Sequence, residues 1–186
     1  METDGDAQLV ARLAEGDRTA LSVLFARHHT RIYRFLVRLT GNDAIADELA
    51  NEVFLELWRK PAAFKGQARV STYLFAIARF KAISVRRKRS EAALDEETMT
   101  ELVDDSDTPE VASQKSDKSK LLEDAVNALP EEFRVVVDLA YYQELSMSEI
   151  ASILEIEEAT VRTRMFRARK RLAVSLTEAG VDRGWP

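Results

Sequence analysis

Six basic side chains crowd into one stretch near the end of the chain, and no acidic residue interrupts them between Ala159 and Thr177. The guanidinium of arginine can bond two acceptors on a guanine edge or hold a backbone phosphate. An ordinary solvated helix face normally mixes the two signs of charge, so the pattern favours contact with nucleic acid. The six residues are Arg162, Arg164, Arg167, Arg169, Lys170 and Arg171.

Two short helices are predicted to position these side chains. Ser146 and Glu149 have the spacing of a capping box, which predicts a helix start at that point. The small Ala151 allows a second helix to approach closely, and Ile156 and Val161 bracket the start of that helix. The spacing is typical of a helix-turn-helix, whose second helix enters the major groove of DNA.

A second basic cluster is interleaved with aromatic rings in a helix that Ser71 is predicted to cap. Basic side chains follow a phosphate backbone, and aromatic faces beside them stack on unpaired bases. The combination favours single-stranded DNA, with burial of the rings as the alternative and as the preferred interpretation for Phe75. The residues are Tyr73, Phe75, Phe80, Arg79, Lys81, Arg86, Arg87, Lys88 and Arg89.

The third pattern is an acidic stripe on a helix predicted from Asp43 to Arg59 and capped by Asn42. Glu48, Glu52 and Glu56 follow one another at i, i+4 steps, a spacing at which like charges repel within an isolated helix. The stripe is therefore unexpected unless a basic surface faces it. A merely soluble face is the alternative.

Composition argues against several classes of protein. The 186 residues include no cysteine, and His28 and His29 have no carboxylate at ligand spacing, so no metal or other cofactor is expected. No phosphate-loop or zinc-protease signature is present, so an enzyme is not expected. No apolar run approaches the roughly 18 residues that span a bilayer, and no signal-peptide pattern opens the chain. A cytoplasmic protein without membrane insertion is predicted.

The formal net charge of −5 hides a change of sign along the chain. Residues 1–90 carry 16 basic and 10 acidic side chains, residues 91–118 carry 2 and 10, and residues 119–186 carry 9 and 12. The overall charge argues against a nucleic-acid partner, whereas the local pattern favours one.

These patterns predict an all-α chain of two small helical domains joined by a flexible acidic linker. The first domain is predicted at 1–92 and the second, which contains the helix-turn-helix, at 119–176. Residues 93–118 are acidic and rich in Ser, Thr and Asp, which is typical of a disordered linker. The tail 177–186 carries no motif.

Three segments resemble parts of bacterial sigma factors of the sigma-70 family, specifically of the small extracytoplasmic-function (ECF) group. TVRTRMFRARKRL, preceded by LSMSEIASILEIE, resembles the C-terminal promoter-binding domain. DAIADELANEVFLELWR is similar to the helix that binds the polymerase clamp helices, and STYLFAIARFKAISVRRKR to the element that opens the −10 region. Glu155 stands where the turn of the family usually has glycine, so it must adopt a left-handed backbone or widen the turn.

The resemblance implies two partners, bacterial core RNA polymerase and promoter DNA, and an anti-sigma factor that sequesters the chain until a stress or other signal arrives. For polymerase contact it implies Glu48, Asn51, Glu52, Leu55 and Trp58. For single-stranded −10 DNA it implies Phe64, Lys65, Gly66, Arg69, Tyr73, Arg79, Phe80, Arg86, Arg87, Lys88 and Arg89. For duplex −35 DNA it implies Thr160, Arg162, Thr163, Arg164, Phe166, Arg167, Arg169 and Lys170.

The −35 residues divide into two roles. Arg162, Thr163, Phe166 and Arg167 are expected to read bases, with phosphate contact or packing expected for Arg164, Arg169 and Arg171. A stand-alone helix-turn-helix regulator is the alternative function. It explains the C-terminal pattern but leaves the acidic stripe and the second basic cluster without a role.

Overall fold

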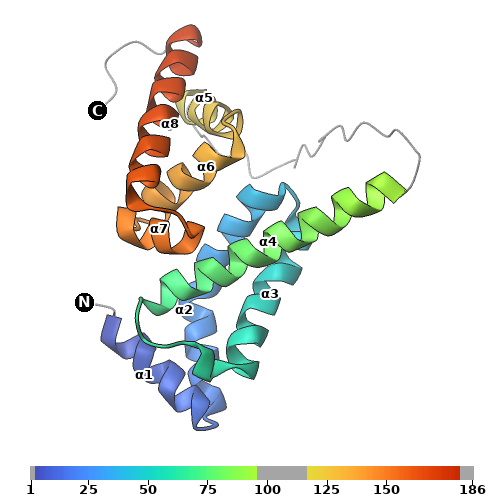
Figure 1. Ribbon diagram of the computed structural model, residues 1–186, viewed down its shortest axis with the longest axis vertical. Helices are drawn as coiled ribbons and strands as arrows, with labels where there is room; N and C mark the ends of the chain where they lie inside the picture. Colours follow the sequence, from blue (N-terminus) through green and yellow to red (C-terminus); the bar gives the residue numbers. More distant parts are fainter. Residues whose placement is uncertain (1–2, 96–116, 181–186) are drawn as a thin grey trace. The chain divides into compact units, whose positions relative to one another are not determined.

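The computed structural model describes residues 3–95 and 117–180 of the chain (Figure 1). The chain divides into two compact units, Met1–Ser106 and Asp107–Pro186. Every regular element among the described residues is a helix, so the predicted all-α class is confirmed. None of the described helices combines the length and the apolar character that crossing a membrane requires.

The first unit is a helical bundle whose helix ends are set by side-chain caps. The carboxylate of Asp17 accepts a hydrogen bond from the Thr19 N–H at 2.9 Å, which starts α2. Gly41 ends α2 in a left-handed conformation, and the Asn42 side chain starts α3 as predicted, by accepting from the Ile45 N–H at 3.0 Å. The elements are α1 (Thr3–Ala14), α2 (Arg18–Thr40), α3 (Asp43–Arg59), a 3-10 turn (Pro61–Ala63) and α4 (Val70–Asp95).

Helix α4 packs against both α2 and α3 (Figure 1). Phe75 of α4 meets Phe35 of α2 edge to face, with ring centroids 5.2 Å apart, and both rings are buried. The predicted burial of Phe75 is therefore confirmed. This contact fixes the rotation of α4, and hence which of its side chains face outward. The same unit also buries Leu24, Ile32, Leu36, Val53, Leu57 and Leu74 completely.

A buried polar contact attaches α1 to α2. The carboxylate of Asp6 lies 2.8 Å from Nε2 of His28, and both side chains are almost fully buried. The other oxygen of Asp6 accepts a hydrogen bond from the guanidinium of Arg27. Because a buried carboxylate is costly without partners, these two contacts offset the cost of burying Asp6.

In the second unit, shorter helices pack along one long helix, α8 (Figure 1). Val161, Met165 and Ala168 follow the i, i+4, i+7 spacing of a helix stripe and are buried. The opposite side of α8 is left exposed. The elements are α5 (Asp117–Asn127), α6 (Glu131–Val137), a π-helical turn (Asp138–Tyr142), α7 (Met147–Leu154) and α8 (Glu158–Glu178).

Several helix ends differ from the sequence predictions. Helix α4 begins at Val70, and the Tyr73 N–H bonds to the carbonyl of Arg69 at 3.1 Å, so Arg69 holds the cap position and the predicted cap at Ser71 is wrong. Helices α4 and α5 both extend into the segment 93–118, and α8 extends into 177–186. The rest of the predicted linker and tail, 96–116 and 181–186, lies outside the described residues.

Candidate nucleic-acid and protein interfaces

The start of the helix-turn-helix is a complete capping box, as predicted. The Ser146 N–H donates to the carboxylate of Glu149 at 2.9 Å, and the Glu149 N–H donates back to the Ser146 hydroxyl at 3.3 Å. Two N–H groups that no helical carbonyl can reach are satisfied in this way. Helix α7 therefore begins at Met147, with its apolar face toward α8.

The turn between α7 and α8 is kept tight by a non-glycine residue in a left-handed conformation. Glu155 has φ 54° and ψ 44°, and its N–H bonds to the carbonyls of Ala151 and Ser152. The Ile156 N–H also bonds to Ala151, at 3.1 Å. Of the two possibilities that the sequence leaves open, Glu155 therefore adopts the left-handed backbone, at a cost of about 1–2 kcal/mol.

The residues that the sequence predicts to read bases lie on the outward face of α8. Phe166 is 70% exposed, so its ring is accessible to a partner. The Arg162 guanidinium bonds to Glu158 one turn earlier, and the hydroxyl of Thr163 donates to the carbonyl of Ala159 at 2.9 Å. The exposed residues are Thr160, Arg162, Thr163, Phe166, Arg167, Arg169 and Lys170.

Two arginines on the edges of this face are held by their own domain. Arg164, whose side chain is only 28% exposed, lies 3.3 Å from the carboxylate of Glu132 on α6. Arg169 donates from Nε to the hydroxyl of Tyr141 at 3.0 Å, and its guanidinium lies 5.7 Å from the centroid of that ring. Packing, one of the two roles expected for them, is thus what the structure favours.

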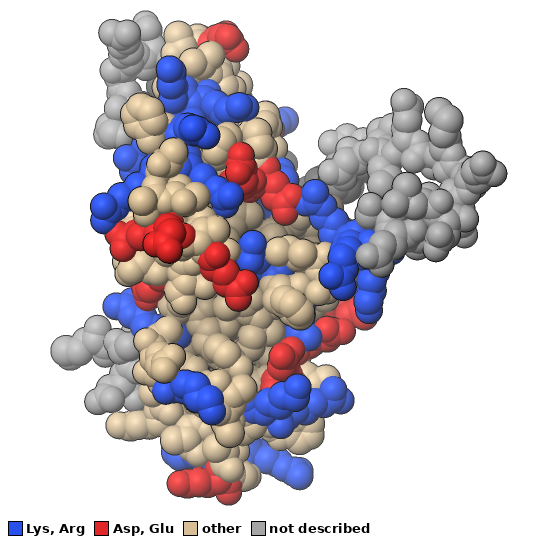
Figure 2. All heavy atoms as spheres, in the orientation of Figure 1, with Lys and Arg blue, Asp and Glu red and all other residues tan. Residues whose placement is uncertain are grey.

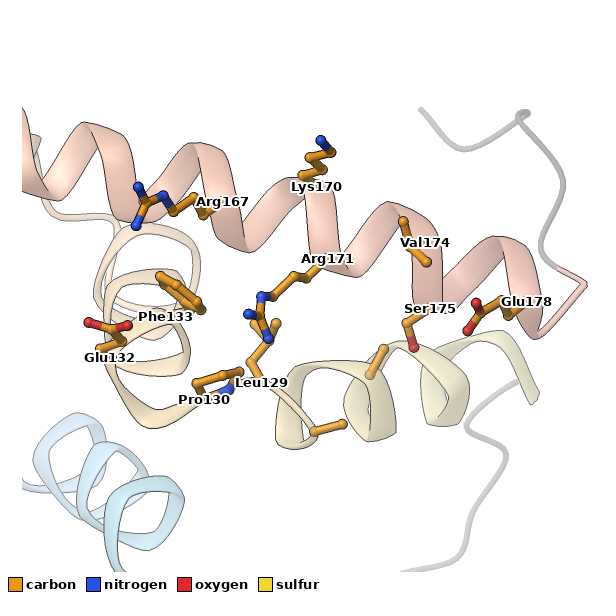
Figure 3. Close-up of a pocket in the computed structure, with 12 residues that line it drawn as sticks. Leu129, Pro130, Glu132, Phe133, Arg167, Lys170, Arg171, Val174, Ser175 and Glu178 are labelled. Atoms are coloured by element: carbon orange, nitrogen blue, oxygen red, sulfur yellow. The ribbon is translucent and has the colours of Figure 1, made fainter.

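Arg171 lies over the Phe133 ring, with 5.2 Å from the guanidinium carbon to the ring centroid. It extends into a pocket of about 670 Å³ between α5, α6 and α8 (Figure 3). Figure 3 shows Arg171 reaching toward Leu129 and Pro130, whereas Lys170 points away from the pocket. Arg171 therefore helps to pack α8 against α6, and Lys170 stays available on the outer surface.

Helix α4 presents basic and aromatic side chains together. Phe80 is 70% exposed, and Arg86, Arg87 and Lys88 are exposed further along the helix. Figure 2 shows blue side chains gathered along α8 and toward the C-terminal end of α4. Arg79 is half-buried, and the side chain of Arg89 lies outside the described residues.

The loop before α4 carries the other residues predicted for the −10 element. Phe64 and Tyr73 are half-buried and pack together, with ring centroids 5.5 Å apart. Burial, together with the nearby charge of Glu56, raises the pKa of the Tyr73 hydroxyl. Lys65, Gly66 and Arg69 are exposed around this pair. The loop and the first turn of α4 thus contribute one ring each to this pair, and the loop also carries exposed cationic side chains.

The acidic stripe of α3 is faced by a lysine from the same chain. Nζ of Lys81 on α4 lies 3.0 Å from Glu52 and 3.1 Å from Glu56, and its side chain is only 17% exposed. Burial alone would lower the pKa of Lys81, but the hydrogen bonds to the two carboxylates raise it. Grouping Lys81 with the DNA-facing cluster was therefore wrong. The signal for its position was its helical spacing from buried Leu74 and Ile77.

The other residues predicted to contact polymerase lie on the same face of α3. Glu48 and Asn51 are exposed, and the Asn51 amide donates to Asp47 at 3.3 Å. Leu55 is half-buried and Trp58 is 45% exposed. Acidic, amide and apolar groups therefore share one accessible surface.

Comparison with known protein families gives two matches, one within each of the two compact units. Residues 24–92 match the family described as Sigma-70 region 2. Residues 119–172 match the family described as Sigma-70, region 4. The first match includes α3 and the basic part of α4, and the second includes α7 and α8 as far as Leu172.

Two relatives match over almost their whole length. The ECF RNA polymerase sigma-E factor of Haemophilus influenzae is 30% identical over 174 residues, which cover 89% of this chain and 92% of that protein. The ECF RNA polymerase sigma factor SigW of Bacillus subtilis is 30% identical over 178 residues, which cover 91% of this chain and 95% of that protein.

Two solved structures share the fold. The sigma factor RpoE, in complex with the anti-sigma factor NepR from Bartonella quintana, matches with a TM-score of 0.72 and 24% identity, over 87% of this chain and 98% of that one. CnrH, in complex with the cytosolic domain of CnrY, matches with a TM-score of 0.70 and 22% identity, over 94% and 99%. At these identities the likeness shows the fold.

Proposed function

This chain belongs to the extracytoplasmic-function group of the sigma-70 family of RNA polymerase sigma factors, and on that premise we propose which of its surfaces performs each step of transcription initiation. The resemblance noted in the sequence is confirmed by the comparisons. The stand-alone regulator is not favoured, because the region 2 match covers the helices that it leaves without a role. The polymerase supplies the chemistry, and this chain acts with it in the cytoplasm.

Helix α8 reads the −35 element in the major groove. The observation that carries this proposal is the exposed set on one face of α8, opposite the buried stripe of Val161, Met165 and Ala168. Arg162 and Arg167 have the length and the donors to bond guanine edges, and the ring of Phe166 suits a thymine methyl group. The turn formed by Glu155 sets the angle at which α8 leaves α7.

Helix α4 and the preceding loop open and hold the −10 element. Phe80 offers an exposed ring for stacking on an unpaired base, and Arg86, Arg87 and Lys88 lie where they can follow the phosphate backbone. The loop with Phe64, Lys65, Gly66 and Arg69 forms the pocket for a flipped base, and Tyr73 and Arg79 of α4 contact the −10 DNA. Arg89 continues the basic run in the sequence.

Helix α3 docks on core RNA polymerase through Glu48, Asn51, Glu52, Leu55 and Trp58. Exposed carboxylates beside a half-exposed tryptophan suit a partner surface that is basic at its edge and apolar at its centre. An anti-sigma factor completes the set of partners. The complexes of RpoE with NepR and of CnrH with CnrY, both similar in fold, support this part of the proposal.

The test combines binding and transcription. The purified chain is mixed with bacterial core RNA polymerase, passed through size-exclusion chromatography, and then used in run-off transcription on genomic fragments. We expect co-elution, and transcripts that start at defined positions only when the chain is present. A chain that shifts duplex DNA but ignores core polymerase would instead be a regulator of the helix-turn-helix type.

A further inference from the structure

Lys81 connects α4, which is proposed to open the −10 element, to α3, which is proposed to dock on the polymerase. Its ammonium group leaves α4 and lies between Glu52 and Glu56 of α3, at 3.0 and 3.1 Å. The next residue back, Phe80, is 70% exposed, whereas the Lys81 side chain is 17% exposed. Neighbouring residues on a helix point about 100° apart, so Phe80 faces outward while Lys81 faces α3.

The contact changes the electrostatics of the docking face. Glu52 and Glu56 are one helical turn apart, where two negative charges repel. A single ammonium group between them replaces that repulsion with two charge-assisted hydrogen bonds. Burial by itself would lower the pKa of Lys81, but the two carboxylates raise it, so the ammonium group stays charged in its half-buried position.

The contact also fixes where the carboxylate of Glu52 points. Lys81 bonds to Oε2 of Glu52, in a side chain that is otherwise 45% exposed. Glu52 therefore presents a carboxylate to a partner in one orientation, whereas an unrestrained glutamate must lose rotamer freedom when it binds.

We propose that Lys81 is a positioning residue for core-polymerase binding, which holds Glu52 and Glu56 in the conformation that the polymerase contacts. The proposal rests on the function assigned above to α3. The proposal predicts the direction in which the affinity for polymerase changes when Lys81 is removed. Removing Lys81 makes the surface of α3 more negative, which by charge alone would strengthen binding to a basic partner. Positioning predicts the opposite, a loss of affinity.

The first experiment replaces Lys81 in the full chain and measures its affinity for core RNA polymerase by fluorescence anisotropy. Lys81→Met keeps the length of the side chain and removes the charge, and we expect affinity to fall about fivefold, within the usual range for coupled contacts. Lys81→Arg retains the charge and should preserve most of the affinity. Lys120→Met, the same change at an exposed lysine of α5, is the matched control and should bind normally.

A double-mutant cycle tests whether Lys81 acts through its two partners. In a Glu52→Gln, Glu56→Gln background, Lys81→Met should have little further effect on affinity, because nothing remains for it to position. Thermal unfolding followed by circular dichroism checks that each variant is folded at the assay temperature. Lys81→Gln, whose neutral amide can still donate, gives a milder change with the same expected direction.

Tighter or unchanged binding by Lys81→Met would overturn the proposal, and so would a full effect in the doubly substituted background. Glu48→Lys separates this failure from a failure of the proposed function. If Glu48→Lys leaves core binding intact, α3 is not the docking helix. If Glu48→Lys abolishes binding while Lys81→Met changes nothing, only the positioning role is lost.

Discussion

Arg169 is bound to Tyr141 in two ways: its Nε–H donates to the phenol oxygen at 3.0 Å, and its guanidinium lies 5.7 Å from the ring centroid. The contact links α8 to the π-helical turn that precedes the helix-turn-helix. Arg169, which the sequence predicts to bind DNA, therefore contacts its own domain. The basic residues of α8 thus divide into those that face outward and those that hold the helix in place.

Substitution of Tyr141 separates the contribution of the hydrogen bond from that of the cation–π contact. Tyr141→Phe keeps the ring and removes the acceptor, and we expect the free energy of unfolding to fall by about 0.5–1 kcal/mol, as for one exposed hydrogen bond. Tyr141→Ala should cost more, because the cation–π contact is lost as well. Urea unfolding measures both. Equal losses in the two variants would mean that the ring contributes nothing.

Arg167 and Arg164 should differ although they are neighbours in the motif. Arg167→Ala removes an exposed side chain, and we expect loss of about 1–3 kcal/mol of discrimination at one −35 base pair with unchanged stability. Arg164→Ala breaks the pair with Glu132 and should lower stability by up to about 1 kcal/mol while leaving base preference intact. Competition binding of the holoenzyme to promoters with single base changes, beside thermal unfolding, tests both. A changed base preference in Arg164→Ala would contradict this assignment.

Glu155→Gly should stabilise the second unit. Glycine adopts φ 54° without a steric cost, so we expect a gain of about 0.5–1 kcal/mol after its greater freedom in the unfolded chain is taken into account. Ser152→Gly, in the regular part of α7, is the control and should destabilise by about 0.5 kcal/mol. Thermal unfolding compares them. A lower melting temperature for Glu155→Gly would show that the carboxylate contributes more than the backbone strain costs.

The cap of α2 predicts a pH dependence. Hydrogen bonds from the Thr19 hydroxyl, and then from Arg12, lower the pKa of Asp17 to about 2. Because the pKa of Asp17 is lower in the folded chain, the ionised carboxylate stabilises the fold above its unfolded-state pKa of about 3.9. This stabilisation is lost as the pH falls through the folded-state pKa of about 2. Asp17→Asn keeps a capping side chain without the charge. We therefore expect the difference in melting temperature between the native chain and Asp17→Asn to shrink between pH 5 and pH 2. A difference that stays constant would contradict the role of the charge.

Phe80→Ala should impair promoter opening. If the ring stacks on an unpaired base, its loss should cost about 1–3 kcal/mol in the stability of the open complex. Permanganate footprinting of unpaired thymines follows this directly. Ile83→Ala, at an apolar residue of α4 that is also exposed, is the control and should leave opening unchanged. A normal footprint with Phe80→Ala would remove stacking from the proposed mechanism.

Helix type and most helix ends followed from local signals in the sequence. The caps at Asn42 and Ser146 depend on side chains within a few residues of the helix start, so the sequence is sufficient to predict them. Ser71 shows the limit, because the helix begins one residue earlier, at Val70, and Arg69 is the N-cap residue instead.

Contacts between helices were not predictable in the same way. Helical spacing shows which side chains share a face, but not which residue of another helix meets that face. Lys81 was grouped with basic neighbours in the sequence, and only the packing of α4 on α3 brings it to Glu52 and Glu56. The same holds for Arg164 and Glu132, which are far apart in the sequence.

The way α8 holds its arginines also bears on the thermodynamics of promoter binding. Each phosphate that a protein neutralises releases roughly 0.9 of a condensed counterion, and this release supplies much of the affinity for duplex DNA. Because Arg164, Arg169 and Arg171 contact α6 and the π-helical turn, we expect α8 to displace fewer ions from DNA than its six positive charges suggest. The affinity of α8 for a −35 element should then depend less on the salt concentration. It should depend more on the effective concentration that attachment to the polymerase provides.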